Sequence, residues 1–239
     1  MAERGLLTHP APRGFEGTRV WVFDLDNTLY PSECNLFAQV DQKMGEFISA
    51  LLGVARPEAK RIQKQYYHEH GTTLAGLMKV NGIDPVHFLD YVHDIDYSPV
   101  EAAPDLSAAL ARLPGRRLIF TNGSRRHAES VAQRLGVTHL FEEIFDIADA
   151  GFVPKPKAAA YDAFLASHGI DGRRAAMFED LPHNLEAPHA LGMTTVLVNS
   201  IMDDHPIYAE IKAWHELPGH IHHMTDNLAG FLAELDTSP

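Results

Sequence analysis

The sequence contains a single cysteine, Cys34, which rules out an internal disulfide and fits a reducing compartment. No apolar run approaches the ~20 residues that a membrane-spanning helix needs. Basic residues are also scarce: 20 Lys and Arg face 32 Asp and Glu, giving a formal net charge of −12. Such a chain has no basic surplus to meet the phosphates of nucleic acid or of an anionic membrane, so neither is predicted as a partner. A cytoplasmic location is predicted, and this charge still permits one small phosphorylated ligand held by a few local cations.

Two kinds of pattern divide the 239 residues. Residues 1–17 lack the apolar core of a signal peptide and are predicted to be a loose leader. Residues 31–99 show helical spacing throughout and no strand, with helices predicted at 36–51, 57–71, 72–81 and 84–93. From residue 104 onward helices alternate with strands, the helices at 104–113, 124–135, 157–168 and 185–191, the strands at 117–120, 144–147, 175–178 and 195–198. Residues 199–239 are predicted to hold a His-rich loop and one amphipathic helix, 228–235.

Repeated strand–helix units of this length imply a parallel sheet with helices on both faces. The apolar strand predicted at 19–23 should join the same sheet, although the helical block separates it from the other strands. The predicted fold class is therefore α/β, with a doubly wound, Rossmann-like parallel sheet. Its core domain is predicted at 1–30 and 100–239, and an inserted all-helical cap at 31–99. Ligands bind such sheets at the carboxyl ends of the strands.

Two carboxylates, Asp24 and Asp26, follow directly after the first predicted strand. Side chains alternate along a strand, so both start on the same side of its carboxyl end. Acids crowded in this way repel each other unless a cation lies between them or one of them holds a proton. Mg²⁺, a hard ion that takes oxygen ligands, is the cofactor predicted here. The alternative is a pair of carboxylates that cap a turn.

The second predicted strand ends in Thr121, Asn122, Gly123 and Ser124. Thr121 offers a hydroxyl and Asn122 an amide, while Gly123 lets backbone N–H groups approach a ligand closely. Ser124 is a good N-cap, so this loop presents the N-terminus of a helix to an anion. An ordinary strand–turn–helix connection with a capping serine is the alternative.

Two further strand ends carry charge. Lys155 lies between prolines that restrict its loop, and a lysine fixed beside the two aspartates would neutralise a bound phosphate. A solvated surface lysine is the alternative.

Asp180 is predicted as a further Mg²⁺ ligand, with Glu179 and Asn184 in supporting positions, unless the acids only cap the following helix. These groups together are the parts that phosphoryl transfer needs: a nucleophile, a metal clamp, a cation and hydrogen-bond donors.

The histidines near the C-terminus, His220, His222 and His223, have a spacing that suggests a metal site. No cysteine or acidic constellation accompanies them, so a solvated polar loop is favoured. Cys34 is expected to be a small packed residue, because no basic environment that would activate a thiol is evident.

In chain order, the motifs DLDNT at 24–28, TN at 121–122, Lys155 and ED…N at 179–184 resemble those of the haloacid dehalogenase-like hydrolase superfamily. The helical block resembles the inserted cap of that superfamily. A closer likeness is to its pyrimidine 5'-nucleotidase branch, carried by VFDLDNTLYP (22–31), YYHEHGTTLAGL (66–77), GFVPKPKAAAYDAF (151–164) and FEDLPHNL (178–185). Many members have Gly-Asp or Asp-Asp in place of Glu179-Asp180, and aspartate in place of Asn184.

The resemblance implies a role for each motif residue. Asp24 would attack phosphorus and form an aspartyl-phosphate. Asp26 would protonate the leaving alcohol and then activate water, a role that suits a carboxyl whose pKa is raised by an acidic neighbour. Its backbone carbonyl would bind Mg²⁺ together with Asp24 and Asp180. Thr121 and the amide of Asn122 would bind phosphoryl oxygens, and Lys155 would bridge Asp24 and the phosphate.

The cap is expected to select the substrate. Tyr66, Tyr67 and His68 could supply a stacking platform and hydrogen-bond donors for a base or sugar, although either tyrosine could instead pack between cap helices. The predicted function is that of an Mg²⁺-dependent enzyme, a phosphomonoesterase acting on nucleoside 5'-monophosphates, pyrimidine ones above all. The alternatives are a sugar-phosphate phosphatase or phosphomutase of the same superfamily, and a non-catalytic phosphate-binding regulatory module. No oligomeric state is predicted.

Overall fold

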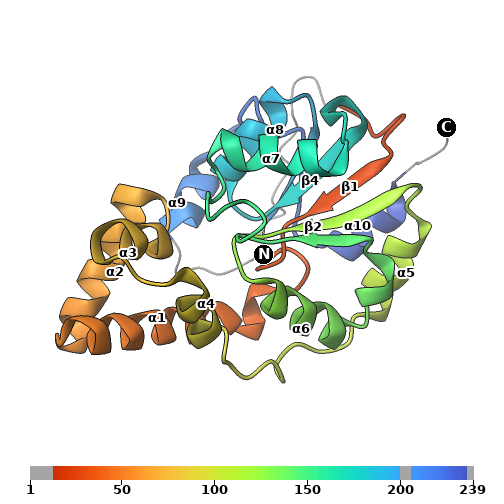
Figure 1. Ribbon diagram of the computed structural model, residues 1–239. Helices are drawn as coiled ribbons and strands as arrows, with labels where there is room; N and C mark the ends of the chain where they lie inside the picture. Colours follow the sequence, from red (N-terminus) through yellow and green to blue (C-terminus); the bar gives the residue numbers. More distant parts are fainter. Residues whose placement is uncertain (1–12, 200–205, 236–239) are drawn as a thin grey trace.

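Six strands form one parallel sheet in the computed structural model, which describes residues 13–199 and 206–235 (Figure 1). The strands lie in the order β3-β2-β1-β4-β5-β6, and every neighbouring pair is parallel. Their bounds are β1 Val20–Phe23, β2 Arg116–Phe120, β3 Glu143–Phe145, β4 Ala175–Glu179, β5 Thr194–Val198 and β6 His223–Thr225. The predicted doubly wound α/β class is confirmed.

Helices cover both faces of the sheet because its strands are apolar on both sides. Trp21 and Phe23 of β1 belong to the apolar cluster that packs on the face with α5 (Pro104–Arg112), α6 (Arg125–Leu135) and α10 (Leu228–Glu234). Val20 and Val22 belong to the cluster on the opposite face, with α7 (Ala158–His168), α8 (Glu186–Ala190) and α9 (Pro206–Ala213). Figure 1 shows α5, α6 and α10 on one side of the sheet and α7 and α8 on the other.

The centre of the sheet is the place where the strand order changes direction. β1 pairs with β2 on one side and with β4 on the other, and Phe23 is level with Ile119 and Phe178. The carboxyl ends of these three strands therefore meet at the switch point, where open α/β sheets bind their ligands.

Four helices lie together beside the carboxyl edge of the sheet (Figure 1). They are α1 (Leu36–Leu52), α2 (Arg56–His70), α3 (Thr73–Asn81) and α4 (Pro85–Val92), and their bounds match the predicted helices within two residues. They share an apolar cluster of their own, which also includes Ile147 and Phe152 from the loop after β3, and Ile95 packs against both this cluster and a cluster of the sheet. We keep the name cap for these helices; its division from the core as a separate domain stays a prediction.

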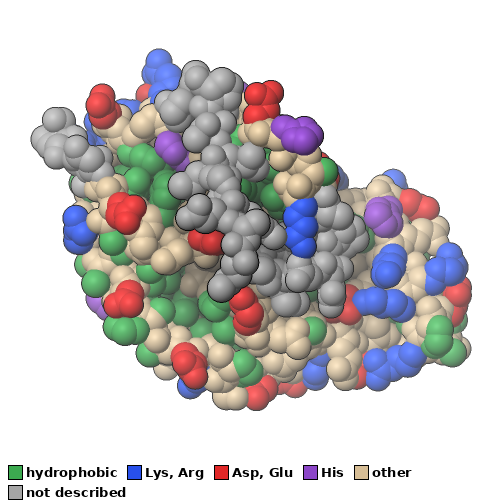
Figure 2. Space-filling view, turned by 180° about the vertical axis from the view of Figure 1, so that it is seen from behind, with side chains coloured by type: hydrophobic (Ala, Val, Ile, Leu, Met, Phe, Trp, Pro, Cys, Tyr) green, Lys and Arg blue, Asp and Glu red, His purple; other side chains and the backbone are tan. Residues whose placement is uncertain are grey.

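Charge is distributed unevenly between the cap and the rest of the chain. Residues 36–92 hold as many Lys and Arg as Asp and Glu, so the acidic surplus lies outside the cap. Seen from behind, Lys and Arg side chains gather over the cap end of the molecule (Figure 2). In α2, Arg56 pairs with Glu46 and Arg61 with Glu58. Among the described helices, none is both long and apolar enough to cross a membrane.

The ends of the chain differ from the prediction. Phe15 is buried and stacks on Trp21 with ring centroids 5.7 Å apart, so residues 13–17 are packed on the sheet rather than forming a loose leader. Residues 1–12 of the predicted leader lie outside the described part. β6 and α9 were not predicted. His222 is buried beside β5, where its Nδ1 accepts from Thr195 N at 3.1 Å, so the C-terminal histidines do not form a solvated loop.

Close packing of α2 on α3 gives a testable prediction. A Cβ on Gly76 of α3 would lie 2.5 Å from Tyr66 Cγ, whereas one on Gly45 of α1 would meet only Gln63 Oε1 at 3.7 Å. Both glycines lie inside helices, so alanine gains the same helix propensity at each, ~1 kcal/mol. Gly76→Ala should nevertheless destabilise the protein by ~1–3 kcal/mol through overpacking, while Gly45→Ala should not. Urea unfolding of both variants checks this, and equal stabilities would contradict it.

Candidate active site

Lys155 joins the ends of the three central strands. Its Nζ lies 2.6 Å from Asp24 Oδ1 and 2.8 Å from Glu179 Oε1, and it donates to Phe120 O at 3.0 Å. All of these side chains are buried, with Lys155 only 2% exposed. The solvated surface lysine considered as an alternative is therefore wrong. The structure brings Lys155, Asp24 and the Glu179-Asp180 pair together as the sequence predicted.

Asn122 holds the lysine loop in place. Its Oδ1 accepts from Lys155 N at 2.8 Å, and its Nδ2 donates to Lys155 O at 3.1 Å. The side-chain amide of Asn122 thus orients the loop that carries Lys155. Its contact with a phosphoryl oxygen stays a prediction.

Thr121 and Gly123 lie next to Asp26. Thr121 is buried, and its Oγ1 accepts from Gly123 N at 2.9 Å, which leaves the hydroxyl proton for another acceptor. A Cβ on Gly123 would lie 3.2 Å from Thr121 Oγ1 and 3.8 Å from Asp26 Oδ2. It would also lie 3.2 Å from His127 Cδ2, so a side chain at position 123 would crowd both Thr121 and His127.

Three buried acids form a cluster. Asp24, Glu179 and Asp180 each offer a carboxylate oxygen, and these oxygens lie within 4.8 Å of one another. Glu179 is held firmly, because Oε1 also accepts from Asn184 Nδ2 at 2.6 Å and Oε2 accepts from Leu181 N at 2.8 Å. Asp26 contributes no side-chain oxygen to this group; its predicted part was through the backbone carbonyl.

Burial and mutual repulsion disfavour the ionised forms of the carboxylates in the cluster. Burial raises the pKa of Asp24 to about 7; Lys155 opposes this rise, whereas Glu179 and Asp26 add to it. Burial and the charge of Glu179 raise the pKa of Asp180 well above its usual range. Burial lowers the pKa of Lys155, but Asp24 and Glu179 outweigh this, so the ammonium stays charged. One ammonium is not enough to keep all three buried carboxylates ionised at neutral pH.

The donor set fits a hard divalent cation. Its atoms are carboxylate oxygens, the ligands that Mg²⁺ prefers. A further oxygen, Asn184 Oδ1, is buried and has no hydrogen-bond partner among the described residues, so it could accept from water held by such an ion. The residues present therefore fit Mg²⁺, and Asp24 and Asp180 are the acids that would hold it.

Asp26 lies in a different environment from Asp24. Its Oδ1 accepts from Tyr30 OH at 2.6 Å and contacts His127 Nε2 at 2.8 Å. Burial raises the pKa of Asp26, but the charge and hydrogen bond of His127 and the hydrogen bond of Tyr30 outweigh it and lower the pKa to about 2. The expected rise through an acidic neighbour is thus wrong for Asp26 and applies to Asp24. Tyr30 and His127 were missed, although His127 stands in the first turn after the Ser124 cap.

The three cap residues expected to touch substrate differ in placement. Tyr66 is buried in the cap, and its hydroxyl donates to Asn81 Oδ1 at 3.0 Å, so its expected contact with substrate is corrected to packing. Tyr67 is 43% exposed, and its pKa is raised by burial and by the charges of Asp180 and Glu179. His68 is exposed beside it. Of the three, Tyr67 is the one whose pKa is affected by the charges of the acidic cluster.

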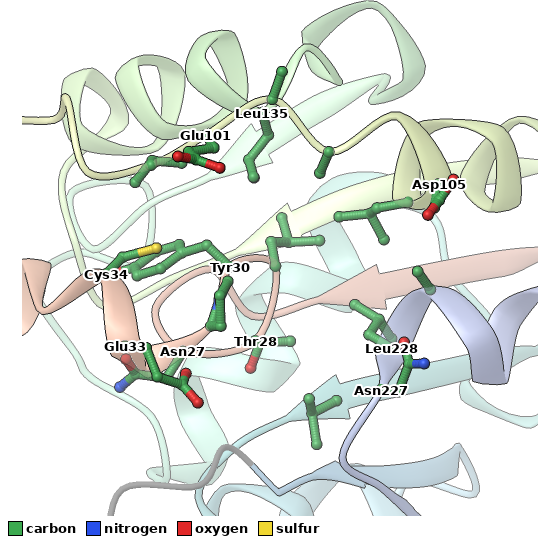
Figure 3. Close-up of a pocket in the computed structure, with 18 of the residues that line it drawn as sticks. Asn27, Thr28, Tyr30, Glu33, Cys34, Glu101, Asp105, Leu135, Asn227 and Leu228 are labelled. Atoms are coloured by element: carbon green, nitrogen blue, oxygen red, sulfur yellow. The ribbon is translucent and has the colours of Figure 1, made fainter.

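A cavity of about 670 Å³ lies next to this site rather than in it. Its wall runs from the loop after β1, which includes Tyr30, to the start of α10 (Figure 3). Glu33, Glu101 and Asp105 line it, so it does not suit a phosphate. Asp24 is not among its lining residues.

The chain belongs to the haloacid dehalogenase-like hydrolases, whose family model matches residues 18–192. The superfamily resemblance seen in the motifs is thus confirmed. A curated relative, Phosphate metabolism protein 8 of Saccharomyces cerevisiae, is 30% identical over 197 residues, which is 75% of this chain. The match spans only 61% of the length of that yeast protein.

Solved structures of the same fold cover almost the whole chain. L-2-haloacid dehalogenase from Xanthobacter autotrophicus matches with a TM-score of 0.52 and 16% identity over 90% of this chain and 97% of its own. The HAD-hydrolase YfnB from Bacillus subtilis, bound to magnesium, matches with a TM-score of 0.54 and 15% identity over 91% of this chain and 99% of its own. At such identities the likeness defines the fold alone.

The raised pKa values predict how metal and pH act together on stability. Asp24 and Asp180 hold protons more tightly in the folded than in the unfolded chain, so without metal the free energy of unfolding falls as pH rises from ~4 through about 7. Mg²⁺ competes with those protons and should raise Tm more at pH 8 than at pH 5. At a concentration of 100 Kd the gain is ~2.7 kcal/mol, or roughly 5–10 °C.

Thermal melts with EDTA or Mg²⁺ at both pH values measure this difference. Asp180→Asn removes one ligand and should shrink the gain, whereas Asp171→Asn should leave it unchanged, because Asp171 is an exposed acid that precedes β4, at the opposite end of this strand from the cluster. An identical Mg²⁺ effect in wild type and Asp180→Asn would contradict the assignment.

Proposed function

We propose that the protein is an Mg²⁺-dependent phosphomonoesterase that hydrolyses nucleoside 5'-monophosphates, pyrimidine ones above all, through an aspartyl-phosphate. The observation that carries this proposal is the contact of Lys155 Nζ with Asp24 and Glu179 beside Asp180, at the carboxyl ends of β1, β2 and β4. A buried nucleophile, a fixed cation and an acidic metal anchor thereby face one another, as phosphoryl transfer requires.

In the first step, a carboxylate oxygen of Asp24 attacks phosphorus and the P–O bond to the alcohol breaks. Asp26 gives its proton to the departing oxygen. Lys155 and the Thr121 hydroxyl, which are fixed by buried hydrogen bonds, stabilise the charge on the phosphoryl oxygens. Mg²⁺ held by Asp24, Asp180 and the carbonyl of Asp26 would supply Lewis-acid stabilisation of the same charge. It would also keep Asp24 ionised.

In the second step, Asp26 takes a proton from water, whose oxygen attacks the aspartyl-phosphate and releases inorganic phosphate and free Asp24. The negative charge of the phosphoryl group opposes the effect of His127 and favours the protonated form of Asp26 when substrate binds. The arrangement of Asp26 is the reason to favour an ester over an organic halide. A halide leaves without a proton, so a dehalogenase has no use for a carboxyl held in this place.

The nucleotide preference rests on the resemblance of the motif segments and on Tyr67. The ring of Tyr67 on α2 is exposed, and the charge of Asp180 contributes to the raised pKa of its hydroxyl. Such a ring could stack on a base. The name of the yeast relative, Phosphate metabolism protein 8, agrees with phosphoryl chemistry.

The nucleophile is tested by Asp24→Asn. The amide cannot attack phosphorus, so turnover of p-nitrophenyl phosphate should fall by at least ~10³-fold. EDTA should stop the wild-type reaction and Mg²⁺ restore it. Phosphate release is the measurement, and a melt shows that the variant is folded. Activity near that of the wild type would refute the role of Asp24.

Base recognition is tested by Tyr67→Ala. Loss of one stacking contact costs ~1–3 kcal/mol, so kcat/KM for UMP and CMP should fall at least ~5-fold, with little change for p-nitrophenyl phosphate. Tyr66→Phe is the matched control, because it removes the hydroxyl of a tyrosine that only packs. Equal losses on all substrates would mean that Tyr67 does not read the base.

A further inference from the structure

We propose that His127 is a positioning residue for the proton transfer: with Tyr30 it fixes one oxygen of Asp26 and leaves the other for the leaving group. This inference rests on the proposed function. It assigns a task to a buried histidine that no motif of the sequence singled out.

The two oxygens of Asp26 have different surroundings. Both polar partners, Tyr30 OH at 2.6 Å and His127 Nε2 at 2.8 Å, contact Oδ1. Oδ2 instead faces the loop after β2, where it is 3.8 Å from the place that a Cβ on Gly123 would take. That loop carries Thr121, a proposed phosphate contact. Oδ2, which makes neither of these two contacts, is thus the oxygen on the side of the proposed phosphate contact.

His127 is itself held from three sides. It is 1% exposed, and its Nδ1 contacts Tyr97 OH at 3.0 Å. Its ring stacks on that of His93 with centroids 4.4 Å apart and an angle of 13° between the planes. His93 Nδ1 in turn contacts Ser124 Oγ at 2.9 Å. A ring fixed in this way cannot turn, so Nε2 stays directed at Asp26.

These contacts come from both connections between the cap and the sheet. Tyr30 lies on the way from β1 to α1, while His93 and Tyr97 lie between α4 and α5. Burial and the charge of His127 lower the pKa of His93 to about 3, so its ring is neutral where it stacks. Hydrogen bonds and one neutral stacked ring therefore link both connections between the cap and the sheet to Asp26.

A histidine that only filled space would behave differently from a positioning residue. Its loss would lower stability and reduce every activity by the same factor. Loss of a positioning residue should instead depend on how much the leaving group needs a proton. p-Nitrophenolate leaves without one, whereas the 5'-alkoxide of a nucleoside needs one.

The experiment compares kcat/KM for UMP and for p-nitrophenyl phosphate in His127→Ala. General acid catalysis contributes ~10²–10⁴-fold, so misplacing the acid should cost ~10–100-fold on UMP and less than ~3-fold on p-nitrophenyl phosphate. His127→Gln, which can still offer an N–H to Asp26, should recover part of the UMP activity. His139→Ala, an exposed histidine of the same segment, should change neither value.

Tyr97→Phe keeps the ring and removes the hydroxyl, which contacts His127 Nδ1 at 3.0 Å and donates to His93 O at 2.9 Å, so it gives the same test if His127→Ala does not fold. It should show the same selective loss to a smaller degree. Equal loss on both substrates in the folded variants, or no loss on UMP, would overturn the role of His127. Absence of phosphatase activity in the wild type would instead overturn the proposed function.

Discussion

One ammonium group, that of Lys155, holds the centre of the site together. It reaches carboxylates at the ends of β1 and β4 and a carbonyl at the end of β2, so three loops from distant parts of the chain depend on it. A buried pair of this kind stabilises little by itself, but removal of one partner leaves an uncompensated charge. The geometry of the site therefore depends on the charge of this lysine. The hydrogen bond that Asn122 donates to the Lys155 backbone and the one that it accepts from it fix the position of the lysine loop.

Two aspartates that are neighbours in sequence acquire opposite properties from this arrangement. Asp24 is buried among acids and its pKa rises to about 7, whereas Asp26 contacts His127 and Tyr30 and its pKa falls to about 2. Environments that push the pKa values of paired carboxyls apart are how one site separates a nucleophile from an acid. The same residue type can thus serve both proposed roles.

Much of the fold and of the candidate site could be predicted because the signals are local in the sequence. Helix spacing, strand alternation and polar residues at strand ends fixed the sheet class and placed Lys155, Asp24 and Asp180 at one edge. The features that were not predicted from the sequence depend on contacts between distant segments. β6 is three residues long and too short to show a period, and His127 stands 101 residues from Asp26. Tyr66 and Tyr67 differ only by one step around a helix, so which of them points inward depends on where α2 packs.

The position of β1 in the sheet has a consequence for synthesis. Both of its partners come much later in the chain, β2 from Arg116 and β4 from Ala175, while the cap helices lie between. A chain leaving the ribosome therefore completes its four local helices before its first strand finds any neighbour, and contacts so distant in sequence close slowly. During that interval the apolar Trp21 and Phe23 have no sheet to cover them.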